Sequence, residues 1–246
     1  MYLGNSSHSP AKIPRQEEIN PQGRLIAQAR VAEQRRIAAQ TCAQTGAVSA
    51  GAATGSSAEL SLRGFSIRDR FAAPDEVEAL RACSRERQSR GDFAAARVGG
   101  PGAEQRREII RGDFTCWLRE PFSPCERVLL ERLEDLRLQF NRELFLGLFE
   151  LELHYARYPP GAAYARHVDQ PQGSAQRRLS FVLYLNPDWR PDDGGALRIY
   201  AAADNYVDVE PLGGRLVCFL TSDREHEVMP ARRERHSISG WFRGRE

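Results

Sequence analysis

The stretch FELELHYARYPPGAAYARHVDQPQG, residues 149–173, marks a change in the sequence from helical to extended patterning. Leu151, Leu153 and Tyr155 recur at every second position, which is the side-chain repeat of a β-strand. Further short runs rich in β-branched, aromatic and aliphatic residues follow it, at residues 177–186, 194–202, 204–211, 214–222 and 235–242. Turn residues separate these runs without intervening helical patterns. The sequence therefore predicts a mainly β fold, as an antiparallel sandwich, jelly roll or barrel.

Two helical patterns precede the strands. Residues 72–83 place Pro74 at a helix start with acidic residues behind it. In residues 123–141, Ser123 and Glu126 form a capping box, and an apolar residue recurs at every third or fourth position along one face. We expect these helices to pack on the outside of the β core.

The first 57 residues differ in composition from the rest of the chain. Residues 45–57 are small and polar, as in a flexible linker, and the segment before them has few large apolar residues. We predict that residues 1–57 are a disordered or partly helical extension, and that residues 58–246 form one catalytic domain.

Charge and cysteine content narrow the class of protein. The 35 basic and 33 acidic residues leave a net charge of +2, whereas a dedicated nucleic-acid-binding protein usually has a clear basic excess. The five cysteines include no CxxC pair, which argues against a disulfide framework and for a reducing compartment. With no apolar run of 18 residues and no secretory segment, we expect a cytoplasmic protein without a membrane partner.

His167 and Asp169 are a candidate pair of metal ligands. On an extended segment they project from the same face, since the side-chain period is two. Two histidines and one carboxylate are the ligand set of non-haem Fe(II) oxygenases. The second histidine should come from another strand, and the downstream candidates are His226 and His236.

An iron oxygenase that uses 2-oxoglutarate also needs a cation for the distal carboxylate of that cosubstrate, because an unpaired buried carboxylate is costly. Arg235, nine residues after His226, can form two parallel hydrogen bonds with a carboxylate. Neighbouring side chains on a strand alternate between its faces. If Arg235 faces inward, His236 faces outward and His226 remains as the third ligand.

Several motifs together resemble the hypoxia-inducible-factor prolyl hydroxylase branch of the Fe(II)/2-oxoglutarate-dependent oxygenases. They are RGDFTCW (111–117), YPPGAAYARHVDQP (158–171), LYLNPDW (183–189), GGALRIY (194–200) and SDREHEVMPARRERHSISGWF (222–242). The resemblance spans roughly residues 60–246 and is densest over the last 90 residues. It implies a double-stranded β-helix (jelly roll) core with supporting α-helices on one face.

Residue roles follow from the same resemblance. It implies that His167, Asp169 and His226 bind iron and that no other side chain is catalytic. It also implies that Arg235 and Tyr184 hold the distal carboxylate of 2-oxoglutarate. Four further residues complete the implied set, with Tyr158 near the cosubstrate, and Trp241 and a loop carrying Arg106 and Arg107 near the substrate.

The resemblance implies a prolyl 4-hydroxylase-type dioxygenase that uses Fe(II), 2-oxoglutarate and dioxygen, with ascorbate keeping the iron reduced. The expected substrate is a prolyl residue of a protein, with release of succinate and CO2. The residues alone leave two alternatives open. One is an iron oxygenase acting on a small molecule or on a nucleic-acid methyl group, although Trp241 stands where that branch needs a second arginine. The other is a β-barrel binding module without turnover.

Overall fold

The computed structural model describes residues 55–96, 110–169, 176–202, 205–222 and 224–245. The N-terminal extension predicted over residues 1–57 therefore lies outside the described residues, apart from its last three. Of these, Ser56 and Ser57 begin helix α2 (Ser56–Arg63), which ends at Gly64 with a φ of 74°. The predicted linker thus gives way to regular structure two residues before its expected end.

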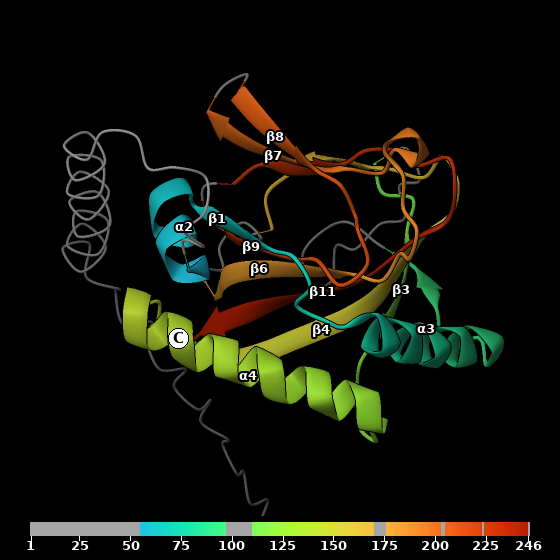
Figure 1. Cartoon of the computed structure of the whole chain (residues 1–246), viewed down its shortest axis with the longest axis horizontal. Helices are drawn as coiled ribbons and strands as arrows, with labels where there is room; N and C mark the ends of the chain where they lie inside the picture. The colour runs from blue at the N-terminus through green and yellow to red at the C-terminus, as the bar shows by residue number, and fades with distance from the viewer. Residues whose placement is uncertain (1–54, 97–109, 170–175, 203–204, 223, 246) are drawn as a thin grey trace, which may run out of the picture. The chain divides into compact units, whose positions relative to one another are not determined.

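Two antiparallel sheets form the core, which confirms the predicted mainly β fold (Figure 1). The described strands are β1 (Phe65–Arg68), β2 (Ala94–Ala95), β3 (Phe114–Trp117), β4 (Leu148–Tyr158), β5 (Tyr164–His167), β6 (Arg177–Tyr184), β7 (Leu197–Ala202), β8 (Asn205–Val209), β9 (Leu216–Leu220), β10 (His226–Val228) and β11 (Arg235–Gly244). The larger sheet has the order β1-β9-β6-β11-β4-β3-β2, and the smaller sheet has the order β5-β10-β7-β8. Every strand of the predicted series is present, and β1, β2, β3, β5 and β10 are additional strands that the sequence pattern did not reveal.

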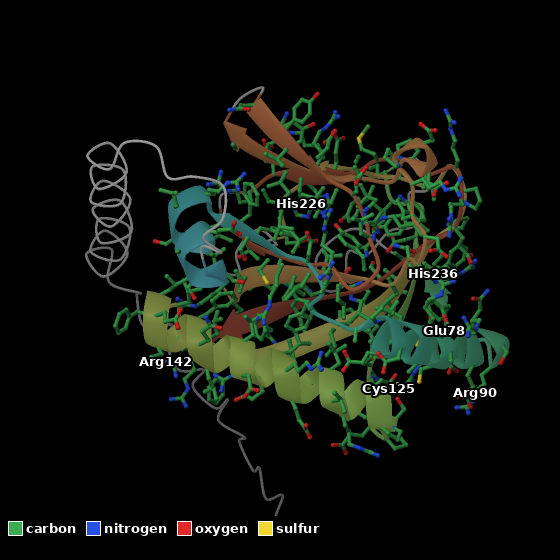
Figure 2. The ribbon with its side chains drawn as sticks, viewed as in Figure 1. Glu78, Arg90, Cys125, Arg142, His226 and His236 are labelled. Atoms are coloured by element: carbon green, nitrogen blue, oxygen red, sulfur yellow. The ribbon has the colours of Figure 1, made fainter. Side chains whose placement is uncertain are left out.

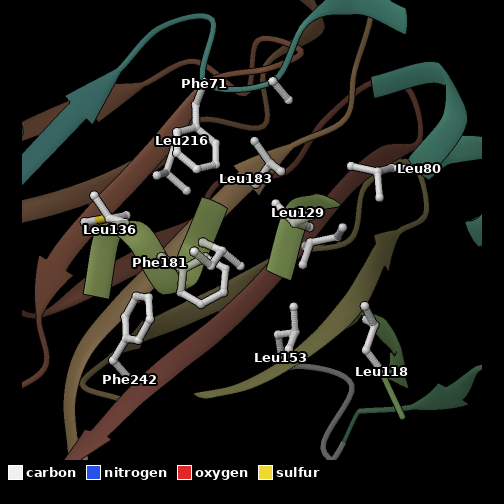
Figure 3. Packing of buried hydrophobic residues seen from close by; sticks show 14 of the residues in the cluster. Phe71, Leu80, Leu118, Leu129, Leu136, Leu153, Phe181, Leu183, Leu216 and Phe242 are labelled. Carbon is white, nitrogen blue, oxygen red and sulfur yellow. The ribbon is translucent and has the colours of Figure 1, made fainter. Parts of the chain in front are cut away.

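Helices α3 (Pro74–Ser89) and α4 (Pro124–Leu144) lie on one side of the larger sheet, and the smaller sheet lies on its other side (Figure 1). The apolar face of α4 is buried as predicted and meets the sheet in a close-packed cluster (Figure 3). Its members include Leu129, Leu136, Leu153, Phe181 and Phe242. This packing leaves the opposite face of the larger sheet free to form a cavity with the smaller sheet.

Strand alternation separates the two faces of β4. Leu153 and Tyr155 belong to the helix-side core, whereas Ala156 and Tyr158 belong to a second cluster between the sheets. Strand β4 pairs along its whole length with β11, with Tyr158 opposite Arg235. The residues of β4 at even positions therefore face the space between the sheets.

A buried carboxylate joins the two helices to the sheet. Glu126 is fully buried and completes the predicted capping box, since its carboxylate accepts from the Ser123 backbone N–H at 2.8 Å. The same carboxylate accepts from Arg87 of α3 at 2.9–3.1 Å and from the Tyr155 hydroxyl of β4 at 3.0 Å. One side chain thus satisfies donors from α3, α4 and β4.

Replacing Glu126 by alanine should lower the free energy of unfolding by about 3–5 kcal/mol, because it leaves the Arg87 charge without its partner. Urea unfolding followed by circular dichroism measures this value. The matched control is Glu134→Ala, since Glu134 pairs with Arg137 on the same helix but is half exposed. That change should cost less than about 1 kcal/mol. Equal losses in the two variants would contradict the structural role of Glu126.

The described cysteines, Cys83, Cys116, Cys125 and Cys218, are free thiols. Among the described residues, no helix has both the length and the apolar character needed to cross a membrane.

Candidate active site

A cavity that is open to solvent lies between the two sheets. Strands β4, β6, β9 and β11 line it from the larger sheet, and β5, β7 and β10 line it from the smaller sheet. Apolar side chains such as Val182, Leu197 and Phe219 form much of the wall. Few polar side chains line this apolar cavity, and their positions determine which ligands it can bind.

His167, Asp169 and His226 meet at one end of the cavity. His226 is the first residue of β10 and pairs directly with His167, the last residue of β5. Asp169 Oδ1 lies 3.5 Å from His167 Nε2, and Asp169 Oδ2 lies 3.6 Å from His226 Nε2. One potential ligand atom from each residue falls within 4.8 Å of the others. The sequence pair at 167 and 169 therefore acquires its third member through strand pairing in the smaller sheet.

The surrounding groups orient all three side chains toward one point. The His167 Nδ1–H donates to the Ala165 carbonyl at 2.7 Å, and the His226 Nδ1–H donates to the Arg224 carbonyl at 3.0 Å. Both Nε2 lone pairs are consequently directed at Asp169. The Ser180 hydroxyl donates to Asp169 Oδ2 at 2.6 Å. Such outer contacts are typical of histidine and carboxylate ligands in metal centres.

The protonation states also suit a metal ion. Burial alone would raise the pKa of Asp169, but His226 and the contacts with His167 and Ser180 hold that pKa well below its usual range. Burial lowers the pKa of His226, which favours its neutral imidazole. A carboxylate beside a neutral imidazole is the state that binds a divalent cation, since metal ligands must be deprotonated. The donor set thus fits Fe(II).

Arg235 lies deeper along the same cavity. The residue is buried, and its guanidinium carbon lies 5.1 Å from the Tyr158 ring centre and 5.0 Å from that of Tyr184. Its Nε–H donates to the carbonyl of Gly195 at 3.0 Å. Gly195 has a φ of +71°, and a Cβ there would come within 2.9 Å of Ala231 and 3.3 Å of Arg235. The second glycine of GGALRIY therefore permits the close approach that holds the arginine.

The hydroxyl of Tyr184 is buried next to this guanidinium without a hydrogen-bond partner among the described residues. Burial raises the pKa of Tyr184, so the hydroxyl keeps its proton and can donate. A buried donor left unpaired is costly, and a guanidinium with an unpaired hydroxyl beside it is complementary to a carboxylate. The residues present thus fit the distal carboxylate of 2-oxoglutarate.

His236 lies on the opposite face of β11, as the alternation predicted. Its Nε2 lies 2.9 Å from Glu234 Oε2, and the residue is absent from the cavity lining. Figure 2 shows His236 near α3, well apart from His226. The choice between the two histidines is thereby resolved in favour of His226 as the member of the cluster.

The residues expected near the substrate divide into two groups. Trp241 lines the cavity, with the guanidinium of Arg177 3.5 Å above its ring. Arg106 and Arg107, together with the loop that carries them, lie outside the described residues. The structure therefore places one of the three.

Other residues at the site had no role assigned from the sequence. Arg111 donates to Asp113 at 2.7 Å and lies 4.6 Å from the Tyr164 ring, which stacks on His167. Ser180 and His154 are further examples, since both occupy the cavity side of their strands. Strand parity relative to Tyr184 and Tyr158 could have revealed these two. The Arg111–Asp113 pair belongs to the motif RGDFTCW, which was singled out from the sequence without a role for either residue.

The pH dependence of stability should report the burial of His154. Burial, with the positive charges of Arg111 and Arg177, lowers the pKa of His154 to about 4, against the opposing effect of Asp113 and Asp169. Between about pH 6.5 and pH 4 the unfolded chain therefore binds a proton that the folded chain does not. The free energy of unfolding should fall by up to about 3 kcal/mol as the pH decreases through this window.

Urea unfolding of the metal-free protein at several pH values between 4.5 and 7 measures this slope. The His154→Phe variant lacks the titrating group and should show a shallower pH dependence than wild type. Identical slopes in the two proteins would show that His154 does not stay neutral in the folded state.

Comparison with known proteins places this geometry in a family. The sequence model of the 2OG-Fe(II) oxygenase superfamily matches residues 153–243, which include the histidine–aspartate cluster, Arg235 and Trp241. The crystal structure of a Pseudomonas putida prolyl-4-hydroxylase superposes with a TM-score of 0.71 and 41% sequence identity, covering 78% of this chain and 98% of that one. The chain belongs to the prolyl hydroxylase family of 2OG-Fe(II) oxygenases.

The chain is also similar to animal proteins. Egl nine homolog 1 of Homo sapiens is 32% identical over 178 residues, and prolyl hydroxylase EGLN3 of Rattus norvegicus is 33% identical over 161 residues. The chain spans 39% of the length of the first and 66% of the second. A Trichoplax adhaerens prolyl hydroxylase, in complex with a peptide of the hypoxia-inducible factor oxygen degradation domain, has a TM-score of 0.68 and 25% identity, covering 87% of this chain and 92% of that one. The expected jelly-roll fold and family are both confirmed.

Proposed function

We propose that this protein is an Fe(II)- and 2-oxoglutarate-dependent dioxygenase that hydroxylates a prolyl residue of a protein substrate. The observation that carries the proposal is the convergence of His167, Asp169 and His226 in the same cavity as Arg235 and the unpaired Tyr184 hydroxyl. Its similarity to prolyl hydroxylases from a bacterium and from animals supports the choice of substrate.

His167, Asp169 and His226 would hold the iron ion. When bound, Fe(II) and 2-oxoglutarate supply the oxidising chemistry, in which dioxygen gives one atom to the substrate C–H bond and one to succinate as CO2 is released. The protein's own residues act by holding and orienting. Ser180 fixes Asp169 through its hydroxyl, and the backbone carbonyls of Ala165 and Arg224 fix the imidazole rings.

Arg235 and Tyr184 would bind the distal carboxylate of 2-oxoglutarate, and Tyr158 would pack beside it. Burial raises the pKa of Tyr158, so this residue is a neutral hydrogen-bonding group rather than a base. The apolar walls at Val182, Leu197 and Phe219 exclude water from the reacting groups. Ascorbate would keep the iron reduced, and the free cysteines favour a reducing, cytoplasmic location.

Turnover with a panel of proline-containing peptides tests the proposal. The panel should include a peptide of the hypoxia-inducible factor oxygen degradation domain, because such a peptide binds the Trichoplax neighbour. We expect one succinate for each oxygen atom added to proline, as measured by mass spectrometry, and no product from His167→Ala. Hydroxylated proteins in a cell extract would identify the natural target.

Two other outcomes would overturn the proposal. Coupled succinate release with a methylated oligonucleotide or a small molecule, and none with any peptide, would assign a different oxygenase substrate. A protein that binds 2-oxoglutarate yet never converts it to succinate would be a binding module.

A further inference from the structure

Most polar side chains that line the cavity have an assigned partner. Three form the histidine–aspartate cluster, Arg111 pairs with Asp113, and Arg235 with the tyrosines fits the distal carboxylate. His154 remains, although it is 2% exposed and lines the same cavity. Its Nδ1 atom is buried and has no hydrogen-bond partner among the described residues. A buried polar atom without a partner costs stability, so its retention points to a bound group that completes it.

The position of His154 separates it from the cosubstrate. Its backbone pairs with Ser239 of β11, whereas Arg235 pairs with Tyr158. Four residues along an antiparallel strand correspond to about 13 Å. The five-carbon chain of 2-oxoglutarate is shorter than this distance and must also reach the iron. His154 therefore lies beyond the cosubstrate, on the part of the wall that remains for the substrate.

His154 belongs to a cluster of three aromatic rings, in which the Trp117 and Trp241 ring centres also lie 6.2 Å apart. Trp117 of β3 is 42% exposed, and its ring centre lies 5.0 Å from the His154 ring. The ring of Trp241, a buried residue of β11, lies 5.4 Å from the His154 ring, and its indole N–H has no partner among the described residues. Arg177 covers the Trp241 ring and is held by Glu152 at 2.8 Å. The cluster thus offers apolar ring surface together with two unpaired nitrogen atoms, His154 Nδ1 and Trp241 Nε1.

We propose that His154 is a specificity-determining residue that hydrogen-bonds the backbone amide following the target proline, with the Trp117 and Trp241 rings packing against the peptide. This inference rests on the proposed function. A prolyl residue has no N–H of its own, so the nearest backbone groups are its carbonyl oxygen and the N–H of the next residue. A neutral imidazole can pair with either of these uncharged groups.

The test combines a change in the enzyme with a change in the substrate. His154→Phe keeps an aromatic ring beside the two tryptophans but removes both nitrogen atoms, while His154→Gln keeps hydrogen-bonding capacity. The probe is the proline peptide with the highest turnover in the panel above, and its analogue has an ester in place of the amide after proline. We expect His154→Phe to raise the KM for the amide peptide about tenfold with little change in kcat. His154→Gln should recover part of this loss.

Combining the enzyme change with the substrate change, as in a double-mutant cycle, tests the hydrogen bond itself. The ester should raise the KM of wild type about tenfold and should leave the KM of His154→Phe unchanged, because the bond it weakens is already absent. Independent, multiplicative effects of the two changes would overturn the assignment, as would an unchanged KM for His154→Phe. A lower Tm of His154→Phe than of wild type would instead indicate a structural residue, since removing an unpaired buried nitrogen should not destabilise the fold.

Failure of the proposed function gives a different result. In that case wild type fails to hydroxylate the peptides while its 2-oxoglutarate binding, followed by the visible absorption of the Fe(II) complex, is retained. If the function holds and only the role of His154 is wrong, wild type and His154→Phe hydroxylate the peptide with the same KM. His154→Phe should match wild type in 2-oxoglutarate binding under either result.

Discussion

The Asp169→Ala protein is expected to bind Fe(II) at least about 100-fold more weakly than wild type and to lose all measurable turnover. Asp169 lies between the two imidazoles, at 3.5 and 3.6 Å from their Nε2 atoms, and contributes the negative charge of the cluster. Its removal leaves two neutral ligands, whereas the ligand set of these oxygenases includes a carboxylate. Anaerobic titration with Fe(II) in the presence of 2-oxoglutarate measures the change through the visible absorption of the complex.

His236→Gln is the matched control for this prediction. His236 is also a buried histidine of the β-sheet, but it bonds Glu234 on the helix side of β11. Its variant should keep the iron affinity of wild type. Wild-type affinity in Asp169→Ala, or an equal loss in His236→Gln, would show that the ion binds elsewhere.

Replacing Arg235 by alanine should weaken 2-oxoglutarate binding by about 10²–10³-fold while leaving Fe(II) binding intact. The guanidinium is buried against Tyr158 and Tyr184. The distal carboxylate would therefore lose its counter-charge at a buried site. Breaking a buried ion pair by removing one partner costs about 3–5 kcal/mol, and each 1.4 kcal/mol is about tenfold in affinity. Tyr184→Phe removes one neutral hydrogen bond and should cost about fivefold to tenfold.

Arg233→Ala provides the control for Arg235. Arg233 is two residues away on the approach to the same strand, but its side chain is 42% exposed and bonds Asp193 and backbone carbonyls at the surface. Equilibrium titration with 2-oxoglutarate on the Fe(II)-loaded proteins compares the two arginines. Equal affinities in Arg235→Ala and Arg233→Ala would mean that the cosubstrate carboxylate binds another group.

Local patterns predicted most of the secondary structure. The alternation of Leu151, Leu153 and Tyr155 identified β4, because side-chain direction on a strand depends only on position in the chain. The capping box of Ser123 and Glu126 likewise marked the start of α4. The short strand β10 has three residues and carries no such repeat, so its pairing with β5 could not be predicted locally.

The alternation of side chains along a strand also predicted part of the site. Because neighbours on a strand face opposite sides, Arg235 pointing inward required His236 to point outward, and the structure has this arrangement. The same rule places His154 on the face of Tyr158, although the sequence offered no reason to single it out. Its two tryptophan neighbours lie on β3 and β11, which are distant from it in the chain, so neither these contacts nor its unpaired nitrogen could be predicted locally.

The sequence by itself determined α3, α4 and the longer strands, and which of their side chains share a face, since both depend on interactions between residues a few positions apart. The tertiary structure alone decided which faces meet. Pairing of β5 with β10 brings His167 beside His226 across 59 residues, and packing of the helices buries Glu126 under Tyr155. These contacts follow from the burial of apolar surface by the whole chain, and no local segment contains the information that fixes them.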